Sequence, residues 1–344
     1  DQLLQAVGHM AQYFHSLGLT GFKDPMAFAP ELSAYAAEDT AGRLNLHVGA
    51  HLTRFSPFNG DWVPMETLAA LRAAHVSPHL HTGFAKLFLD GVPIAKTAAF
   101  CAPYPGDDPG AHDPEAHLLI PPARLADEVT ALDRAGLTVK MHAVGDRAVQ
   151  AGLDAIAAAR AANGASGLRH EIAHANFIRP ADLPRFAALD AVAEVSPKLW
   201  YPNPVTAGQR RVLGDARADS CHPVRSLLDA GAAVVYGSDW PAAAPDANPW
   251  TGLAGMVTRT DPTGVYPGSV GADQAVPLDR ALPIFTRNAA RALRLDHLTG
   301  QLAPGLSADL IVLDHAPEHL TASELGALRP RATLFEGRIV HGDL

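Results

Sequence analysis

The chain has 344 residues, of which 48% are apolar and 18% charged, with a formal net charge of −9 and a pI of about 6.0. This composition excludes wholesale disorder and argues against a general nucleic-acid binder, which would carry a basic face. No apolar run approaches eighteen residues, so no membrane span is expected, and two cysteines, Cys101 and Cys221, fit a reducing compartment such as the cytoplasm.

Short apolar runs alternate with helical stretches along most of the chain. An amphipathic helix opens it, with apolar residues at helical spacing between Leu3 and Phe14. The apolar runs predict seven strands, at residues 19–23, 43–52, 84–90, 137–142, 169–174, 191–196 and 232–239. Helical patterns cover residues 66–74, 123–135, 146–162, 180–189, 223–230 and 278–294. Residues 101–122 form a long loop rich in Pro, Gly and Asp.

Strands that are apolar on both faces and alternate with helices indicate an α/β fold with a parallel sheet covered by helices. Seven strands suit a doubly wound sheet, or a (β/α)8 TIM-type barrel that lacks its first strand. The opening helix favours the barrel. Beyond residue 300, residues 308–313 and 331–341 read as strands, with a tight turn at Glu336-Gly337, and indicate part of a small β unit. We therefore expect a barrel over residues 1–300 and a second domain over 301–344.

Polar side chains stand where several of these strands end. His142, His174 and Asp239 close three of the predicted strands. Lys86 and Asp90 share one face of an earlier strand, because side chains alternate along a strand. In a parallel barrel the active site lies at the carboxyl ends of the strands, so these side chains are expected to converge.

Two imidazoles and a carboxylate at neighbouring strand ends can hold a divalent cation, and zinc, manganese and iron(II) all suit these ligands. Such an ion polarises a carbonyl and lowers the pKa of its water, and a carboxylate beside it can relay the proton. Histidines at strand ends also occur as hydrogen-bonded scaffold, so the pattern alone leaves both interpretations open. Lys140 shares a face with His142 and is a rival ligand.

Six segments in the right order resemble the amidohydrolase superfamily, specifically the YtcJ-like branch of amidohydrolase family 3, which includes N-substituted formamide deformylases. They are KLFLDGVPIAKTAAF at 86–100, HAVGDRA at 142–148, RHEIAHANFIRPADLPRFAAL at 169–189, YGSDWP at 236–241, FTRNAARAL at 285–293 and TGQLAPGLSADLIVLD at 299–314. The last segment resembles the one that leads into the small β-sandwich of this family, so residues 301–344 are expected to form part of that sandwich.

The resemblance implies a role for each matching residue. Lys86 would be the strand lysine, often N-carboxylated so that it bridges two metal ions. His142 and His174 would be metal ligands, and Asp239 would be both a ligand and the catalytic proton shuttle. The family hydrolyses C–N bonds of small amides, formamides and N-acyl compounds, with one or two ions bound.

Three further residues complete the expected site. His170 shares a strand face with His174 and is expected to orient a ligand from behind it. Asp90 is either a turn residue before Gly91 or part of the site wall. Trp240 stands at a strand end, where it would line the substrate pocket or pack in the core.

The chain also departs from the family. The family's first strand carries a His-x-His pair, which is absent from the start of this chain; His79-Leu80-His81 is a possible substitute. The order of motifs therefore suggests the C-terminal portion of a longer enzyme. The alternative to an active hydrolase is a truncated, inactive barrel that binds metal weakly or binds a partner chain. Exposed strand edges would favour a homo-oligomer.

Overall fold

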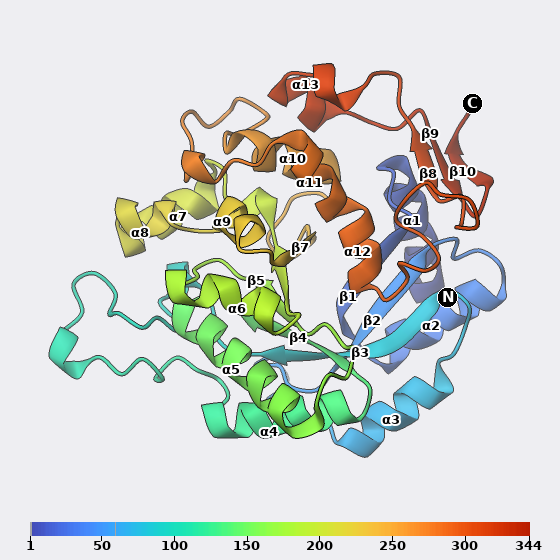
Figure 1. Ribbon diagram of the computed structural model, residues 1–344. Coiled ribbons are helices and arrows are strands. Elements are labelled where there is room, and N and C mark those ends of the chain that lie inside the picture. The colour runs from blue at the N-terminus through green and yellow to red at the C-terminus, as the bar shows by residue number, and fades with distance from the viewer. Residues whose placement is uncertain (1, 59) are drawn as a thin grey trace. The chain divides into compact units, whose positions relative to one another are not determined.

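The computed structural model describes residues 2–58 and 60–344. They form two compact units. The first unit contains residues up to Leu87, together with 286–320 and 328–344, and the second contains 88–285 and 321–327. Both units are built from α/β elements (Figure 1). These two units are not separated at residue 300. The domain boundary expected there stays a prediction.

Three parallel strands and four helices form most of the first unit. The strands are β1 (Gly21–Ala27), β2 (His47–Thr53) and β3 (Leu80–Phe88), where β1 pairs with β2 and β2 with β3. The helices are α1 (Gln2–Ser16), α2 (Ala29–Thr40), α3 (Met65–Ala74) and α12 (Arg287–Ala292). Every residue of β2 is buried, and these include three polar ones, His47, His51 and Thr53.

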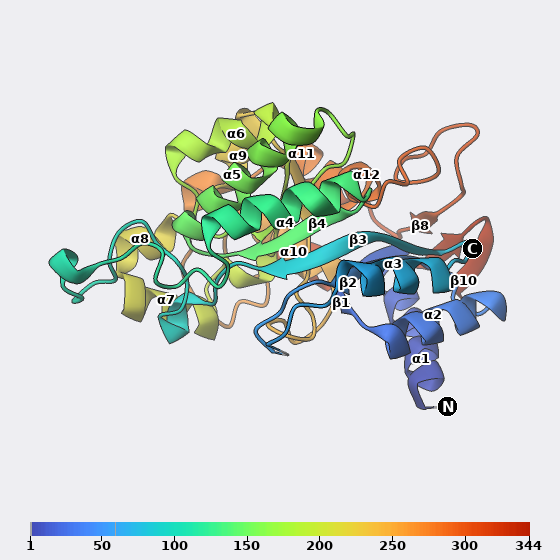
Figure 2. The same ribbon diagram turned by 90° about the horizontal axis from the view of Figure 1, so that it is seen from below.

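A small antiparallel sheet completes the first unit. It contains β8 (Leu310–Val312), β9 (Ala332–Phe335) and β10 (Arg338–Gly342), with β9 in the middle. The tight turn predicted at Glu336-Gly337 joins β9 to β10, where both residues have positive φ. Helix α1 packs against both α2 and β10 (Figure 2).

Four parallel strands run through the second unit in chain order. They are β4 (Thr138–Ala143), β5 (Glu171–His174), β6 (Val192–Val195) and β7 (Ala233–Tyr236). The helices are α4 (Pro122–Arg134), α5 (Asp146–Asn163), α6 (Leu183–Ala188), α7 (Pro204–Leu213), α8 (Asp215–Asp219), α9 (Val224–Asp229), α10 (Pro249–Thr258), α11 (Leu278–Phe285) and α13 (Ala322–Ala327). Helices α4 and α5 lie side by side against β4 (Figures 1 and 2).

Six short 3-10 helices connect these elements. They are η1 (Pro93–Ala95), η2 (Pro109–Ala111), η3 (Pro180–Asp182), η4 (Pro197–Leu199), η5 (Ala272–Gln274) and η6 (Pro317–His319). The described residues thus give an α/β fold with seven parallel strands and a small antiparallel sheet, as the sequence predicts. The single helix expected at 278–294 is instead two, α11 and α12, which separate at Thr286.

Candidate functional site

The carboxyl ends of β4 to β7 carry three of the predicted site residues. His142 is the next-to-last residue of β4, His174 is the last residue of β5, and Asp239 follows β7 by three residues. Because all four strands are parallel and paired in chain order, their carboxyl ends meet along one edge of the second unit. The imidazoles of His142 and His174 are in edge-to-face contact, with their centroids 4.6 Å apart.

His142 is held on several sides. Its ring stacks on Phe88, with centroids 5.1 Å apart. Its Nε2 lies 3.2 Å from the carbonyl oxygen of Gly91 and 3.8 Å from Oδ1 of Asp90. These contacts fix the ring orientation of a half-buried histidine, as a metal or proton-transfer site requires.

His174 and Asp239 both occupy unusual backbone conformations. His174 has φ of +70°, its neighbour Ala175 has +44°, and Asp239 has +56°. Residues other than glycine adopt this left-handed region at a cost in free energy, and such residues gather at functional sites. Asp239 does not cap a helix, since the next helix, α10, begins at Pro249.

Asp90 joins two segments beside His142. Its carboxylate accepts backbone N–H bonds from Ala99 at 3.0 Å, Val144 at 3.0 Å and Gly145 at 2.8 Å. Complete burial raises the pKa of Asp90 to about 7, although the three hydrogen bonds act in the opposite direction. Asp90 is thus an anchor between the 91–99 loop and the turn after β4.

Lys86 is the predicted site residue that lies in the first unit. It is 3% exposed and pairs with Thr53 in the β2–β3 ladder. Its role as a ligand stays a prediction.

The His-x-His of His79 and His81 lies at the opposite end of β3 from Lys86. His79 is engaged by Asp39 at 2.6 Å and Glu336 at 3.0 Å, which argues against its substitution for the missing pair.

His170 and Lys140 have structural partners. His170 accepts the backbone N–H of Val139 at its Nδ1, and its Nε2 lies 2.9 Å from Oδ1 of Asp133. Lys140 is 2% exposed and forms ion pairs with Glu171 and Glu194. Burial lowers the pKa of Lys140, but the two carboxylates outweigh it and raise it, so this lysine stays charged. The ion pairs with Glu171 and Glu194 account for the burial of Lys140 without a metal ion.

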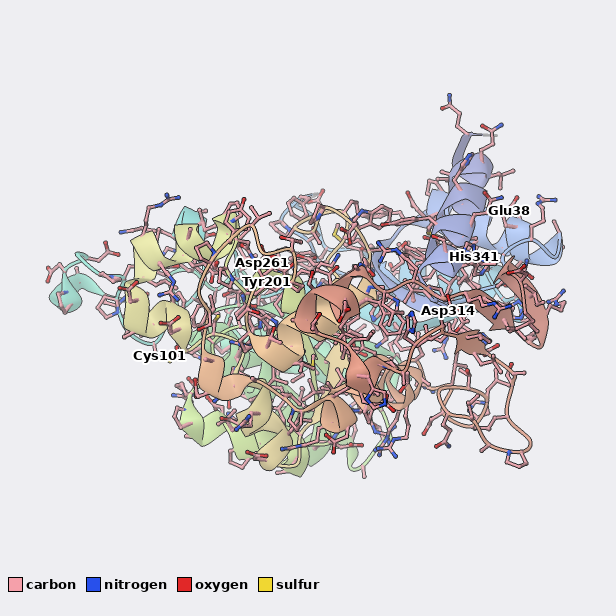
Figure 3. The ribbon with its side chains drawn as sticks, turned by 90° about the horizontal axis from the view of Figure 1, so that it is seen from above. Glu38, Cys101, Tyr201, Asp261, Asp314 and His341 are labelled. Atoms are coloured by element: carbon pink, nitrogen blue, oxygen red, sulfur yellow. The ribbon has the colours of Figure 1, made fainter. Side chains whose placement is uncertain are left out.

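Aromatic residues lie near the ends of β6 and β7. Trp240 is half-buried, and its backbone N–H donates to Oγ of Ser238. Tyr201 and Asp261 are labelled in Figure 3. Burial raises the pKa of Tyr201 to about 12, with a smaller contribution from Asp261, so its phenol stays protonated. No contact assigns Trp240 to a substrate pocket, and that role stays a prediction.

His222 is a buried histidine near the end of β5 that the sequence did not single out. It is 0% exposed, and its backbone N–H donates to the Asn176 carbonyl, two residues beyond His174. Burial is the main reason that its pKa lies well below the usual value, and the nearby Arg259 adds to the effect. A histidine before a short helix carries no periodic pattern, so only the fold brings it here.

The donors fit a divalent cation by type and only partly by position. Imidazole and carboxylate are ligands that zinc accepts. His142 and His174 are in contact. Nevertheless, among residues 2–58 and 60–344 no three His, Cys, Asp or Glu side chains form a group that could hold a metal ion.

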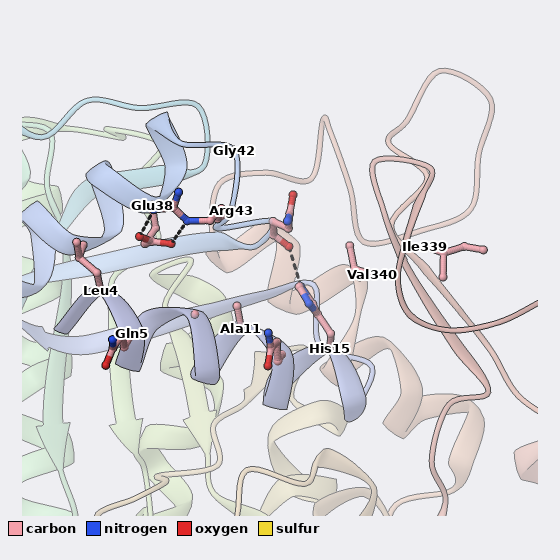
Figure 4. A pocket seen from close by; sticks show the side chains of 12 residues that line it. Leu4, Gln5, Ala11, His15, Glu38, Gly42, Arg43, Ile339 and Val340 are labelled. Carbon is pink, nitrogen blue, oxygen red and sulfur yellow. Dashed lines mark hydrogen bonds and ion pairs between the residues drawn. The ribbon is translucent and has the colours of Figure 1, made fainter. Parts of the chain in front are cut away.

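A pocket of about 710 Å³ lies elsewhere, in the first unit (Figure 4). It is lined by α1, by residues near the end of α2, and by Ile339 and Val340 of β10. Its polar contacts are internal: Arg43 pairs with Glu38 at 2.6 Å, and His15 bonds the Asn45 carbonyl at 2.9 Å. The strand-end residues therefore remain the better candidate for chemistry.

No helix in the described part of the chain is long and apolar enough to cross a membrane.

Comparisons with known proteins identify the family of this chain. The chain is 32% identical over 324 residues to Protein LONG AFTER FAR-RED 3 of Arabidopsis thaliana, covering 91% of this chain and 53% of that protein. It is 26% identical over 353 residues to N-substituted formamide deformylase of Arthrobacter pascens, covering 98% and 60%. The chain thus spans little more than half the length of these relatives.

A solved structure shows the same fold. It is an uncharacterized metal-dependent hydrolase from Pyrococcus horikoshii OT3, with a TM-score of 0.73 and 23% identity, covering 93% of this chain and 61% of that one. The model of the amidohydrolase family matches residues 1–341. This match confirms the resemblance that the six ordered segments predict: the chain belongs to the amidohydrolase family.

Proposed function

We propose that this chain carries the catalytic strand ends of a hydrolase that cleaves a C–N bond in a small amide-type molecule, such as a formamide or another N-acyl compound. One observation carries the proposal. In a member of the amidohydrolase family, two histidines at neighbouring strand ends are in ring contact, and an aspartate follows a strand of the same parallel set. The similarity to a formamide deformylase supports this substrate class.

Each residue has a proposed task. His142 and His174 would hold a divalent cation, for which zinc is the expected choice, with Asp239 as the third ligand. When bound, the ion would polarise the substrate carbonyl and lower the pKa of water. Asp239 takes the proton from the attacking water and passes it to the leaving nitrogen. Asp90 fixes the backbone around His142 through its three N–H bonds.

The Asp239→Asn variant tests the proton relay. We expect it to reduce hydrolysis of N-substituted formamides by at least about 100-fold, because general acid–base catalysis contributes on this scale. The circular dichroism spectrum of Asp239→Asn should match that of the natural chain, which shows that the fold is unchanged. Turnover is measured by release of the amine, with Asp113→Asn as the control. Asp113 is exposed, and its carboxylate accepts the backbone N–H of Glu115 at 2.9 Å. Full activity of purified Asp239→Asn would refute this role.

A second candidate function is an inactive chain that binds metal weakly or binds a partner. The absence of a three-donor group among the described side chains favours it. Metal analysis of the purified chain separates the two functions. One or two zinc ions per chain together with amide hydrolysis support the hydrolase, whereas neither ion nor turnover supports the alternative.

A further inference from the structure

His79 lies directly before β3 and contacts a carboxylate with each of its ring nitrogens. Its Nδ1 lies 2.6 Å from Oδ1 of Asp39 in α2, and its Nε2 lies 3.0 Å from Oε1 of Glu336 in the turn between β9 and β10. Its backbone N–H also donates to Oδ2 of Asp39 at 2.9 Å. Three segments that are distant in the sequence therefore meet at one imidazole within the first unit.

The two ring contacts require the charged form of His79. An ionised carboxylate only accepts hydrogen bonds, and a neutral imidazole has a single N–H, whereas the imidazolium has two. Only the imidazolium can therefore donate to both carboxylates at once. Burial lowers the pKa of His79, but the hydrogen bonds and negative charges of Asp39 and Glu336 outweigh it and raise the pKa above its usual value.

The two carboxylates are held with different strength. The Asp39 side chain is 3% exposed and keeps its bond from the His79 backbone N–H whatever the charge of the ring. The Glu336 side chain is 39% exposed and lies 3.4 Å from Arg338, so water and this guanidinium can replace the imidazole. Loss of one proton is therefore expected at Nε2, where it breaks the contact with Glu336 and leaves the contact with Asp39 intact.

Other titratable groups surround His79 without taking over its role. The charged or titratable side chains around His79 and its neighbour His81 are Asp39 of α2, His47 of β2, Asp309 before β8, Glu336 and Arg338 of the β9–β10 hairpin, and His297 after α12. Burial lowers the pKa of His81 to about 4, and the charges of His47 and His79 add to the effect, so His81 is neutral where His79 titrates. His47 pairs with Asp309 at 3.3 Å.

We propose that His79 is a pH-sensitive clamp, which as the imidazolium binds both Asp39 of α2 and Glu336 of the β9–β10 turn, and as the neutral ring releases Glu336. The clamp is complete below about pH 6.5, the usual pKa of histidine, and is lost as the pH rises through the higher pKa of the folded chain. The small sheet is then attached less firmly to α2 and β3. This proposal does not depend on the proposed hydrolysis.

Titration of the ring tests the clamp directly. In the whole chain with ¹³C-labelled histidine, the His79 signal, identified by its loss in His79→Gln, should titrate with a midpoint above about 6.5. In Glu336→Gln the midpoint should fall by about 0.3–0.7 pH units, the effect of a partly exposed ion pair. The matched control is Glu318→Gln, which removes an exposed carboxylate of η6 in the same unit and should leave the midpoint unchanged.

Amide hydrogen exchange tests the release of the turn. The Glu336 and Gly337 amides donate to the Asp309 carboxylate and the Ala308 carbonyl. Their protection, corrected for the intrinsic effect of pH, should fall about 2–5-fold between about pH 6 and pH 8 in the natural chain and stay level in Glu336→Gln. Protection within α2 should not change in either chain.

Three results would each overturn the proposal. They are a His79 midpoint below about 6.5 in the natural chain, an unchanged midpoint in Glu336→Gln, and an equal loss of protection at the turn in the natural chain and in Glu336→Gln. If Glu336→Gln does not fold, the titration of His79 and the exchange of the turn amides in the natural chain decide the question.

Discussion

At the scale of single residues, Gly145 shows how tightly the turn after β4 is built. A Cβ atom there would lie 1.9 Å from the Ala99 carbonyl oxygen and 2.5 Å from its carbon. Both are backbone atoms, so no side chain can move aside. We expect Gly145→Ala to destabilise the fold by about 1–3 kcal/mol, the range of overpacking, or more. Urea denaturation followed by tryptophan fluorescence measures the loss.

Gly8→Ala is the matched control. A Cβ at Gly8, within α1, meets no atom within 4 Å. Alanine is the better helix former by about 0.5–1 kcal/mol, so this variant should be neutral or more stable. Equal denaturation midpoints for the two variants would show that the turn tolerates a side chain and that the contact with Ala99 is not constraining.

The site residues differ in how far the sequence can reveal them. His142, His174 and Asp239 stand at strand ends in ordered motifs, so pattern and resemblance find them. The left-handed backbone of His174 and Asp239 leaves no such signal, because only tertiary contacts impose it. Folding brings the His222 N–H to the Asn176 carbonyl, 46 residues earlier in the chain, and no spacing rule predicts that contact.

At the scale of elements, the carboxylate of Asp309 joins the small sheet to β2 within the first unit. Asp309, just before β8, accepts N–H from Glu336 at 2.8 Å and O–H from Ser307 at 2.9 Å, and it lies 3.3 Å from His47 Nε2. Burial raises the pKa of Asp309, but its hydrogen bonds outweigh that effect and lower it to about 2.

This depressed pKa makes stability depend on pH. The unfolded carboxyl titrates near 3.9, so the stabilising contribution is complete above about pH 4 and is lost as the pH falls to about 2. We expect Asp309→Asn to lower the free energy of unfolding by about 2 kcal/mol at pH 7, with the difference vanishing near pH 2. The control is Asp314→Asn at an exposed position (Figure 3). A pH-independent difference would contradict this account.

Strands were easier to predict than helices. All seven parallel strands were expected, most of them because buried strands are largely apolar, although β1 contains Lys23 and Asp24 and is only partly buried. Helix α2 was missed: Pro30 and a run of small residues hide its weakly amphipathic pattern. The break at Thr286 was also missed, because the apolar pattern continues across it, and the structure shows φ of −124° and ψ of −96° at that residue.

At the scale of the whole molecule, the chain passes between the two units more than once. It leaves the first unit after residue 87, returns at 286, leaves again at 321 and returns at 328. The short excursion is α13, which packs on α10 in the second unit. The Gly326 carbonyl there accepts hydrogen bonds from Asn248 at 3.0 Å and Thr251 at 3.3 Å, and Leu325 is 4% exposed.

Replacing residues 322–327 with a Gly-Ser linker of equal length tests what this excursion contributes. The second unit would lose the burial of Leu325 and both hydrogen bonds, which together are worth about 3–5 kcal/mol. Amide hydrogen exchange in α10 should therefore accelerate, while exchange in β1 to β3 stays unchanged. The same replacement at residues 301–306, which are mostly exposed in the first unit, should leave α10 unaffected. If both replacements accelerate exchange in α10 equally, then altering the chain between the units, and not the packing of α13, is what destabilises the second unit.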